Sequence, residues 1–196
     1  MASKQFYDTV RTALFPNGLK QSQVDGFEAI MNVCNGVIND QRQFAYILAT
    51  IYHECDGTMQ PIEESGKGAH YDYGKKLKRG AGPGHRIPYD TPDQLYYGRG
   101  YVQLTWYENY ALQSKLLSVD LLNHPELALQ PDIAAKILIH GMVHGDFTGH
   151  FLSQYFNPTE CDYVNARKII NGLDCAEKIA GYAKIFESAL KLNQSA

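Results

Sequence analysis

The chain has 196 residues, enough for one domain with its own hydrophobic core, and 20% of them are charged. Its net charge of −3 gives no electrostatic reason to expect nucleic acid or an acidic membrane surface as a partner. No segment approaches the roughly 20 consecutive apolar residues of a membrane span, and the N-terminus lacks the apolar run of a signal peptide. We therefore expect a soluble, cytoplasmic product without stable insertion into a membrane.

Helical periodicity dominates the first part of the chain. Apolar residues recur at helical spacing over 6–14, and a second helix is expected from Ser22 or Asp25 to Val33. Asp40 is a suitable N-cap for a third helix. The apolar side chains of this third helix form one stripe, made of Phe44, Ile47, Leu48, Ile51 and Cys55.

The helical spacing of apolar residues is lost after residue 55. Residues 56–95 are rich in Gly, Lys and Pro and are predicted to form a long loop. A short strand is predicted at 100–105, followed by a helix over about 108–117. Pro131 begins a further helix, and the last helix runs over about 175–192. Because no repeat or interdomain linker is found, the whole chain is expected to form one mostly helical domain with a small β element.

The predicted strand lies in YYGRGYVQLTW, residues 96–106, which combines aromatic rings with alternating polar and apolar residues. The alternation directs Val102 and Leu104 to a core and leaves Gln103 and Thr105 on the opposite face. A hydrogen-bonding strand face flanked by aromatic rings suits a flat, polar ring such as a sugar. The 14 tyrosines agree with a wet binding groove, because Tyr joins an apolar face to a polar tip.

Glu54, at the end of the third helix, is a candidate general acid. It lies at the margin of the apolar stripe, and apolar neighbours raise the pKa of a carboxyl. A proton held near neutral pH is what cleavage of a glycosidic bond requires of its acid. Such cleavage usually needs a second carboxylate, and Glu63, Glu64 and Asp72 are the candidates. The alternative interpretations are a solvated helix end and a charged surface turn.

A metal site is not favoured. The pair His53-Glu54 lacks the second histidine of a zinc-protease motif, since Gly57 stands there. A looser cluster is formed by three histidines and one aspartate: His140, His144, Asp146 and His150. We expect these side chains to be exposed or hydrogen-bonded rather than bound to a metal ion. We expect no metal and no cofactor.

The cysteines and the Asn-Gly pair near the end of the chain are explained by structure alone, without a role in catalysis. A chain of this length does not need disulfides, so free, buried thiols are expected at Cys34, Cys55, Cys161 and Cys175. The pair Asn171-Gly172 is typical of a turn that ends a helix.

Together these segments resemble glycoside hydrolase family 19, which contains plant-type chitinases and related bacteriophage endolysins. The resemblance covers most of the chain, from about Phe44 to Ala189, and its parts follow the family's order: AYILATIYHE, YYGRGYVQLTWYENY, ARKIINGLD and EKIAGYAKIFE. It implies a lysozyme-like, mainly α fold of α+β type with a small β-sheet lining a substrate cleft. It also implies inverting hydrolysis of β-1,4 links between N-acetylhexosamines.

The resemblance also assigns site residues by their positions in the motifs. Glu54 matches the general acid of the family. Groups that bind the sugar or the attacking water, or that line the cleft, match Tyr96, Tyr97, Gln103, Thr105, Asn109 and Asn171. The plant enzymes carry their general base in a K-Q-E-R-G-like element, where this chain has Lys78. Phage-like members have a glutamate nine or ten residues after the acid, which indicates Glu63 or Glu64.

We interpret residues 1–196 as a single catalytic domain of a peptidoglycan-cleaving endolysin, a lysozyme-type muramidase or glucosaminidase-like glycosidase. We expect a monomer that accumulates in the cytoplasm of a host bacterium and reaches the wall after a separate protein permeabilises the membrane. One domain with neither signal peptide nor wall-binding module favours this interpretation over a secreted chitinase. Two alternatives stay open: a chitinase with the same chemistry, and a non-catalytic glycan-binding protein on the same fold.

Overall fold

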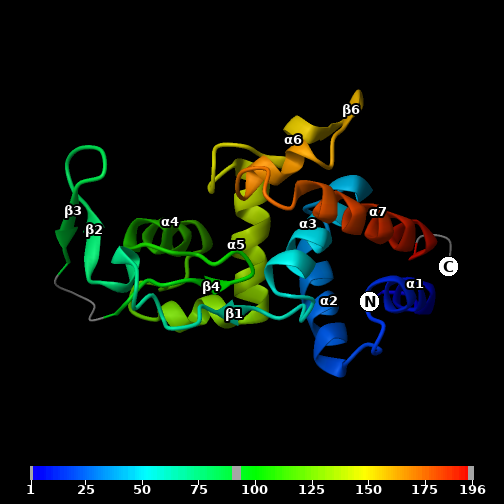
Figure 1. Cartoon of the computed structure of the whole chain (residues 1–196), viewed down its shortest axis with the longest axis horizontal. Helices are drawn as coiled ribbons and strands as arrows, with labels where there is room; N and C mark the ends of the chain where they lie inside the picture. The colour runs from blue at the N-terminus through cyan, green and yellow to red at the C-terminus, as the bar shows by residue number, and fades with distance from the viewer. Residues whose placement is uncertain (1, 90–93, 194–196) are drawn as a thin grey trace. The chain divides into compact units, whose positions relative to one another are not determined.

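Helices make up most of the regular structure in this computed structural model, which describes residues 2–89 and 94–193 (Figure 1). The chain divides into two units, Met1–Gln60 with Leu138–Ala196, and Pro61–Ile137. The sheets are small, with two strands each, so the predicted mainly α class is confirmed. None of the described helices is long and apolar enough to cross a membrane.

The first unit is built from helices and one short hairpin. Its elements are α1 (Lys4–Leu14), α2 (Gln21–Cys34), α3 (Gln41–Glu54), α6 (Leu152–Tyr155), β5 (Phe156–Asn157), β6 (Glu160–Cys161), the 3-10 helix η3 (Asn165–Ile169) and α7 (Ala176–Asn193). Helix α7 packs against α1 and α3. The ring of Phe27 in α2 lies 5.5 Å from that of Phe6 and 5.9 Å from that of Phe186. Burying each such ring stabilises the unit by about 1.5–3 kcal/mol.

Single residues set the start of α3 and the approach of a neighbouring segment to α2. The Asp40 carboxylate accepts the backbone N–H of Arg42 at 2.8 Å, as its predicted role of N-cap requires. Helix α3 then ends at Glu54, three residues after Ile51, which is the last buried residue of the helix. Gly26 lets the segment after α3 approach α2, because a Cβ atom there would lie 1.9 Å from the carbonyl oxygen of Met59.

The second unit has short strands where a long loop is predicted. Its elements are β1 (Ile62–Glu63), the 3-10 helix η1 (Asp72–Gly74), β2 (Leu77–Arg79), β3 (Arg86–Pro88), β4 (Arg99–Gly100), α4 (Tyr107–Leu117) and the 3-10 helix η2 (Pro125–Leu129), while α5 (Pro131–His144) begins here and continues into the first unit. The prediction of a long loop over 56–95 is therefore partly wrong. Loss of helical periodicity cannot reveal strands of two or three residues.

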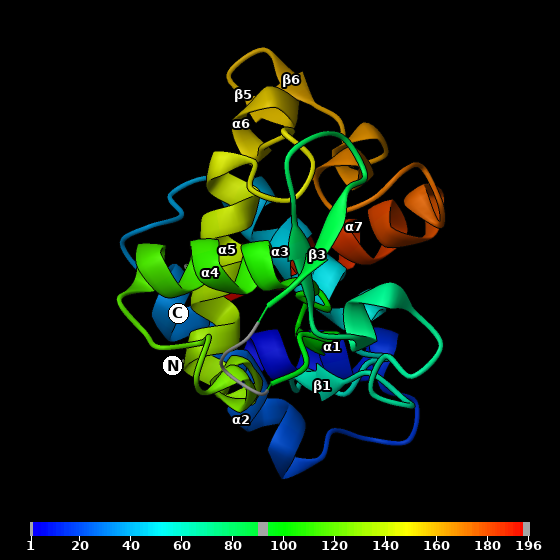
Figure 2. The same cartoon turned by 90° about the vertical axis from the view of Figure 1, so that its left-hand side faces the viewer.

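The strands of the second unit form two antiparallel pairs. Strand β1 pairs with β4, so that Glu63 lies opposite Arg99. Strands β2 and β3 form a hairpin, which both views draw beside α4 (Figures 1 and 2). The core of this unit is rich in tyrosine and contains Tyr89, Tyr96, Leu104, Tyr110, Leu121, Ala128, Ile133 and Ile137.

The strand predicted at 100–105 is instead a tight turn. Strand β4 ends at Gly100, and Arg99 and Leu104 exchange backbone hydrogen bonds of 3.3 and 2.9 Å across the turn. Gly100 and Gln103 have φ angles of +91° and +53°, which a strand does not allow. Leu104 still reaches the core, as predicted, because it re-enters the pairing after the turn.

The four cysteines are free, and they fall into two classes. Cys34 and Cys55 are buried, and burial raises the pKa of both thiols to about 12. Cys161 and Cys175 are exposed. The expectation of buried thiols is confirmed for the first pair and wrong for the second, whose residues lie in β6 and just before α7.

Candidate active site

Glu54 is the last residue of α3, and its carboxylate accepts a hydrogen bond from the guanidinium of Arg167 in η3. The Arg167 side chain is 4% exposed and that of Glu54 is 20% exposed. Arg167 Nε also donates to the carbonyl oxygen of Asp174 at 3.0 Å, so the guanidinium is held from two sides. Glu54 therefore has a buried cationic partner, where the sequence argument assumes apolar shelter.

The ion pair gives Glu54 a fixed position and a specific chemical capacity. A neighbouring guanidinium stabilises the carboxylate that remains after a carboxyl has donated its proton. Sequence reasoning missed Arg167, although it lies in the quoted segment ARKIINGLD. Arg167 is itself buried in η3, between buried Ala166 and Ile169, and the available signal was an arginine placed among apolar residues in that segment.

Glu63 lies in β1 and is surrounded by a hydroxyl and two cations. Its Oε1 accepts the hydroxyl of Tyr97 at 2.6 Å. Lys67 Nζ lies 3.5 Å from Oε2, and Arg99 Nε lies 4.0 Å from Oε1. The Tyr97 hydrogen bond, together with the two nearby positive charges, lowers the pKa of Glu63. This carboxylate is therefore ionised but a weak proton acceptor.

Glu64 is held by neutral donors. Its Oε1 accepts the hydroxyl of Tyr73 at 2.7 Å, and its Oε2 accepts the backbone N–H of Gly98 at 2.9 Å. Burial and the bond to Glu64 raise the pKa of Tyr73, which keeps the hydroxyl a donor. Within residues 2–89 and 94–193, no cation lies within ion-pair distance of Glu64. Its negative charge is thus not neutralised by a neighbouring side chain.

Gly98 makes this arrangement possible. A Cβ atom on Gly98 would lie 2.5 Å from the amide oxygen of Gln103 and 3.2 Å from Oε2 of Glu64. Gln103 Nε2 in turn donates to the carbonyl oxygen of Ile62 at 3.1 Å, which ties the turn after β4 to β1. The YYGRG motif therefore holds the two glutamates, whereas the sequence analysis assigns Gln103 to substrate.

The other predicted substrate residues differ in exposure. Tyr96 is 1% exposed and its hydroxyl donates to the carbonyl oxygen of Leu122, so the prediction that it lines a cleft is wrong. Tyr97 is 7% exposed, and its hydroxyl is used by Glu63. An aromatic ring next to glycines gives no signal in the sequence that separates a core position from a surface position.

Thr105, Asn109 and Asn171 remain candidates for contact with a ligand. The side-chain amide of Asn109 donates to the carbonyl oxygen of Thr105 at 2.9 Å, so the two residues are positioned together. Asn171 is exposed, and its side-chain oxygen accepts the N–H of Gly172 at 2.9 Å in the turn after η3. The turn at Asn171-Gly172 is confirmed, and contact with sugar stays a prediction for all three residues.

The histidine cluster is hydrogen-bonded, as predicted. His140 Nδ1 lies 2.7 Å from an oxygen of Asp146, and the ring of His144 lies 4.3 Å from that of His140. His150 Nδ1 lies 2.9 Å from the hydroxyl of Tyr155. In the part of the chain that the structure describes, no three His, Cys, Asp or Glu side chains are grouped to hold a metal ion.

Comparison with known families identifies the chain. The family model described as chitinase class I matches residues 23–142, more than half of the sequence. The chain belongs to glycoside hydrolase family 19. The matched residues include Glu54, both glutamates at β1 and the YYGRG motif, whereas Arg167 and Asn171 lie beyond them.

Plant proteins of family 19 match part of the chain. Endochitinase 1 of Theobroma cacao is 34% identical over 102 residues, which cover 49% of this chain and 31% of the endochitinase. The inactive chitinase-like protein 1 of Hevea brasiliensis is 35% identical, covering 43% of this chain and 32% of that protein. The chain thus spans about a third of the length of the curated relatives it matches.

Solved structures of family 19 chitinases share the fold over nearly the whole chain. Chitinase C from Streptomyces griseus HUT6037 superposes with a TM-score of 0.63 at 22% identity, covering 95% of this chain and 75% of the chitinase. A bacterial family 19 chitinase superposes with a TM-score of 0.55 at 21% identity, covering 95% and 92% of the two chains. The mainly α architecture therefore agrees with that of family 19.

We expect Arg167 to act as a positioning residue in this family 19 protein. Arg167→Met should lower kcat on a glycan substrate about 10- to 100-fold with a smaller change in KM, since the proton donor loses the partner of its conjugate base. It should also destabilise the fold by about 2–3 kcal/mol, because Glu54 is left as a partly buried, unpaired carboxylate. Steady-state kinetics and urea unfolding measure both effects.

The controls for this prediction are a conservative variant and a double mutant. Arg167→Lys keeps the charge and should restore part of kcat. In a Glu54→Gln background, Arg167→Met should cost clearly less stability than it does alone. Equal destabilisation in the two backgrounds, with unchanged kcat, would show that the ion pair has no part in activity.

Proposed function

We propose that this family 19 protein is an endolysin that hydrolyses β-1,4 glycosidic bonds of bacterial peptidoglycan with inversion. The observation that carries the proposal is the presence of two carboxylates in different environments. Glu54 has a buried guanidinium beside it, and Glu64 accepts hydrogen bonds only from neutral donors among the described residues. The guanidinium by itself favours the ionised form of Glu54, so the role of Glu54 as the acid rests on its place in the family 19 motif. The neutral donors around Glu64 leave that carboxylate able to accept a proton.

In the proposed reaction, Glu54 donates its proton to the glycosidic oxygen as the bond from that oxygen to the anomeric carbon breaks. Water attacks the anomeric carbon from the opposite face, and its proton passes to Glu64. Arg167 stabilises the Glu54 carboxylate that results, and proton exchange with solvent restores both groups. The two carboxyls and water are sufficient, so no cofactor takes part in the mechanism.

Glu64 is preferred over Glu63 as the base. A general base must take up a proton in the transition state, and a lowered pKa makes a carboxylate less able to do so. Glu63 has such a lowered pKa, because Tyr97 donates to it and Lys67 and Arg99 lie close. No comparable cation lies beside Glu64 in the described residues, so its charge is available to water and to a positively charged transition state.

Two alternatives have specific support. Several relatives are named endochitinases, which favours unmodified chitin as the substrate with the same chemistry. One relative is named an inactive chitinase-like protein, which favours a glycan-binding protein without catalysis. The proposal further includes a monomer that stays in the host cytoplasm until the membrane is permeabilised, and the sequence alone supports this part.

Product analysis tests the proposal. Purified peptidoglycan sacculi and colloidal chitin are each incubated with the protein, while new reducing ends and free amines are quantified and the first product's anomer is followed by NMR. We expect reducing ends from sacculi, no amines, and the α-anomer first, since inversion of a β-bond gives α. Reducing ends from chitin alone would identify a chitinase, and release of amines would point to peptide cleavage and the histidine cluster.

A further inference from the structure

A basic hairpin, residues 75–86, stands out in the second unit. It comprises Lys75 and Lys76, β2, the loop after β2 and Arg86, the first residue of β3. It holds five of the 18 Lys and Arg residues of the chain and no Asp or Glu. The whole chain has a net charge of −3, so this positive charge is local. No step of the proposed hydrolysis uses it.

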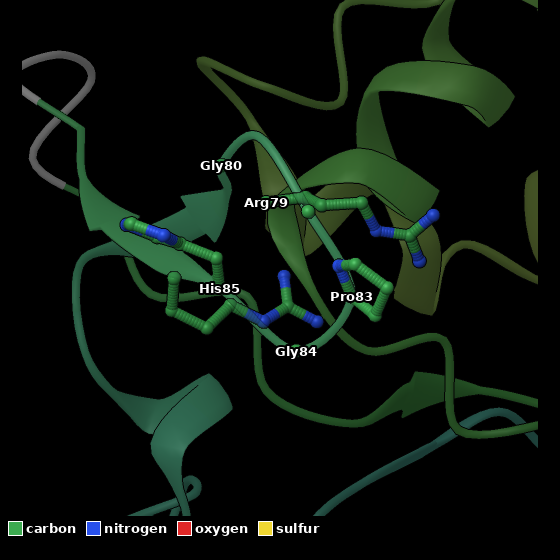
Figure 3. A pocket seen from close by; sticks show the side chains of 7 residues that line it. Arg79, Gly80, Pro83, Gly84 and His85 are labelled. Atoms are coloured by element: carbon green, nitrogen blue, oxygen red, sulfur yellow. The ribbon is translucent and has the colours of Figure 1, made fainter.

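The loop of the basic hairpin is open to solvent. A hollow of about 500 Å³ is lined by Arg79, Gly80, Gly82, Pro83, Gly84, His85 and Arg86. Figure 3 shows the side chains of Arg79 and His85 extending away from each other on either side of this loop. A Cβ atom built on Gly82 or Gly84 would meet no atom within 4 Å, so a ligand can approach the backbone there.

The cations of the hairpin are only partly neutralised. Arg86 and Arg79 share one carboxylate, that of Glu108, at 2.5 and 3.7 Å. The Arg79 side chain remains 71% exposed, against 21% for Arg86. Lys75 pairs with Asp72 through side chains that are about two-thirds exposed, and water weakens such a pair. Arg79 and Lys75 therefore present positive charge to solvent.

A chain of contacts joins this surface to the proposed base. The guanidinium of Arg86 lies 3.5 Å from the ring centroid of Trp106, and that ring lies edge-on to Tyr73 at 5.7 Å. Tyr73 donates its hydroxyl to Glu64. Trp106 has φ and ψ of +73° and +142°, a strained conformation for a residue with a side chain. Because such a conformation persists only where the surroundings hold it, the contacts with Arg86 and Tyr73 help to fix the position of Trp106. The hairpin and Glu64 are thus parts of one packed assembly within the second unit.

We propose that the basic hairpin binds the carboxylates of peptidoglycan stem peptides and thereby selects an anionic glycan over neutral chitin. This inference rests on the proposed function. Peptidoglycan carries lactyl-peptide branches on alternate sugars, whereas chitin has no charged group for Arg79 or Lys75 to attract. Contact between the hairpin and the Glu64 assembly favours a glycan substrate as the ligand over a nucleic acid or an acidic lipid surface.

The test measures binding separately from cleavage. All variants are made in a Glu54→Gln background and cosedimented with sacculi free of teichoic acid, with sacculi whose carboxylates are amidated by carbodiimide and methylamine, and with chitin. Lys75→Gln/Arg79→Gln removes two exposed charges of the hairpin. Lys115→Gln/Lys184→Gln removes two exposed charges elsewhere and serves as the matched control. Arg86 is left intact because it contacts Trp106.

We expect the hairpin variant to bind sacculi about three- to tenfold more weakly in 50 mM salt, less so in 500 mM salt, with no change on chitin. The matched control should change less than twofold. Amidated sacculi should bind the parent protein weakly and show no further loss in the hairpin variant. Thermal unfolding at an unchanged temperature confirms that the variant is folded.

The inference is wrong if the hairpin variant binds sacculi as tightly as the parent protein, or if the parent protein does not bind sacculi. It is also wrong if the hairpin variant loses as much affinity for chitin as for sacculi, or if the parent protein binds amidated sacculi as tightly as untreated sacculi. Selective loss of binding to anionic vesicles or to duplex DNA would assign the hairpin to a membrane or to nucleic acid instead. Failure of the proposed function would be seen in the cleavage products and not in these binding measurements. A protein that cleaves only chitin, yet binds sacculi through the hairpin, is no endolysin but retains the anion site.

Discussion

Glu54→Gln should lower kcat on purified sacculi by about 10²- to 10⁴-fold, the usual contribution of a general acid. Glutamine has the size of glutamate and can still accept the hydrogen bond from Arg167, but it has no proton to give to the leaving oxygen. KM should change little, since the substitution removes a transition-state interaction. Reducing ends released from sacculi over a range of substrate concentrations measure both constants.

Glu187→Gln is a matched control for this substitution. The Glu187 side chain in α7 is 20% exposed, as that of Glu54 is, and it also has a cation close by, Lys191 at 2.8 Å. The control should keep kcat within about threefold, as expected for a change away from any catalytic group. If Glu54→Gln keeps more than a tenth of the activity while its fold is intact, Glu54 is not the acid.

The helices could be predicted from the sequence because each carries its own signal. Apolar residues at helical spacing bury one face of α1, whereas α3 is buried on all sides over residues 45–51. Asp40 and Pro131 mark where two helices begin. Family motifs also indicated Glu54 and the two glutamates at β1 as candidates, and their catalytic roles stay predictions. These features depend on short stretches of sequence, which is why they could be found without a structure.

The contacts of the site could not be predicted in the same way. Arg167 lies 113 residues from Glu54 along the chain, and Tyr97 lies 34 residues from Glu63. Such pairs depend on the tertiary fold, and no local pattern encodes them. The strand predicted at 100–105 failed for a related reason, because alternation cannot reveal that Gln103 adopts a positive φ and turns the chain.

Glu64→Gln should lower kcat on sacculi by about 10²- to 10⁴-fold, because water loses its proton acceptor. The amide would also set an NH₂ group against the Tyr73 hydroxyl or the Gly98 N–H, both of which are donors. We therefore expect a loss of about 1–3 kcal/mol in the free energy of unfolding, the cost of a donor left unpaired. Kinetics and urea unfolding separate the two effects.

Glu63→Gln and rescue by azide decide between a catalytic and a structural role. Azide attacks the anomeric carbon without needing a base, so it should restore turnover in Glu64→Gln and form an α-glycosyl azide; it cannot repair a distorted fold. Glu63→Gln should reduce kcat less than about tenfold and should gain nothing from azide, since its carboxylate is engaged by Tyr97 and two cations. The reverse pattern, with Glu63→Gln inactive and rescued, would make Glu63 the base. The cations around Glu63 would then serve to keep the base ionised, and Glu64 would serve to fix β1 against Gly98.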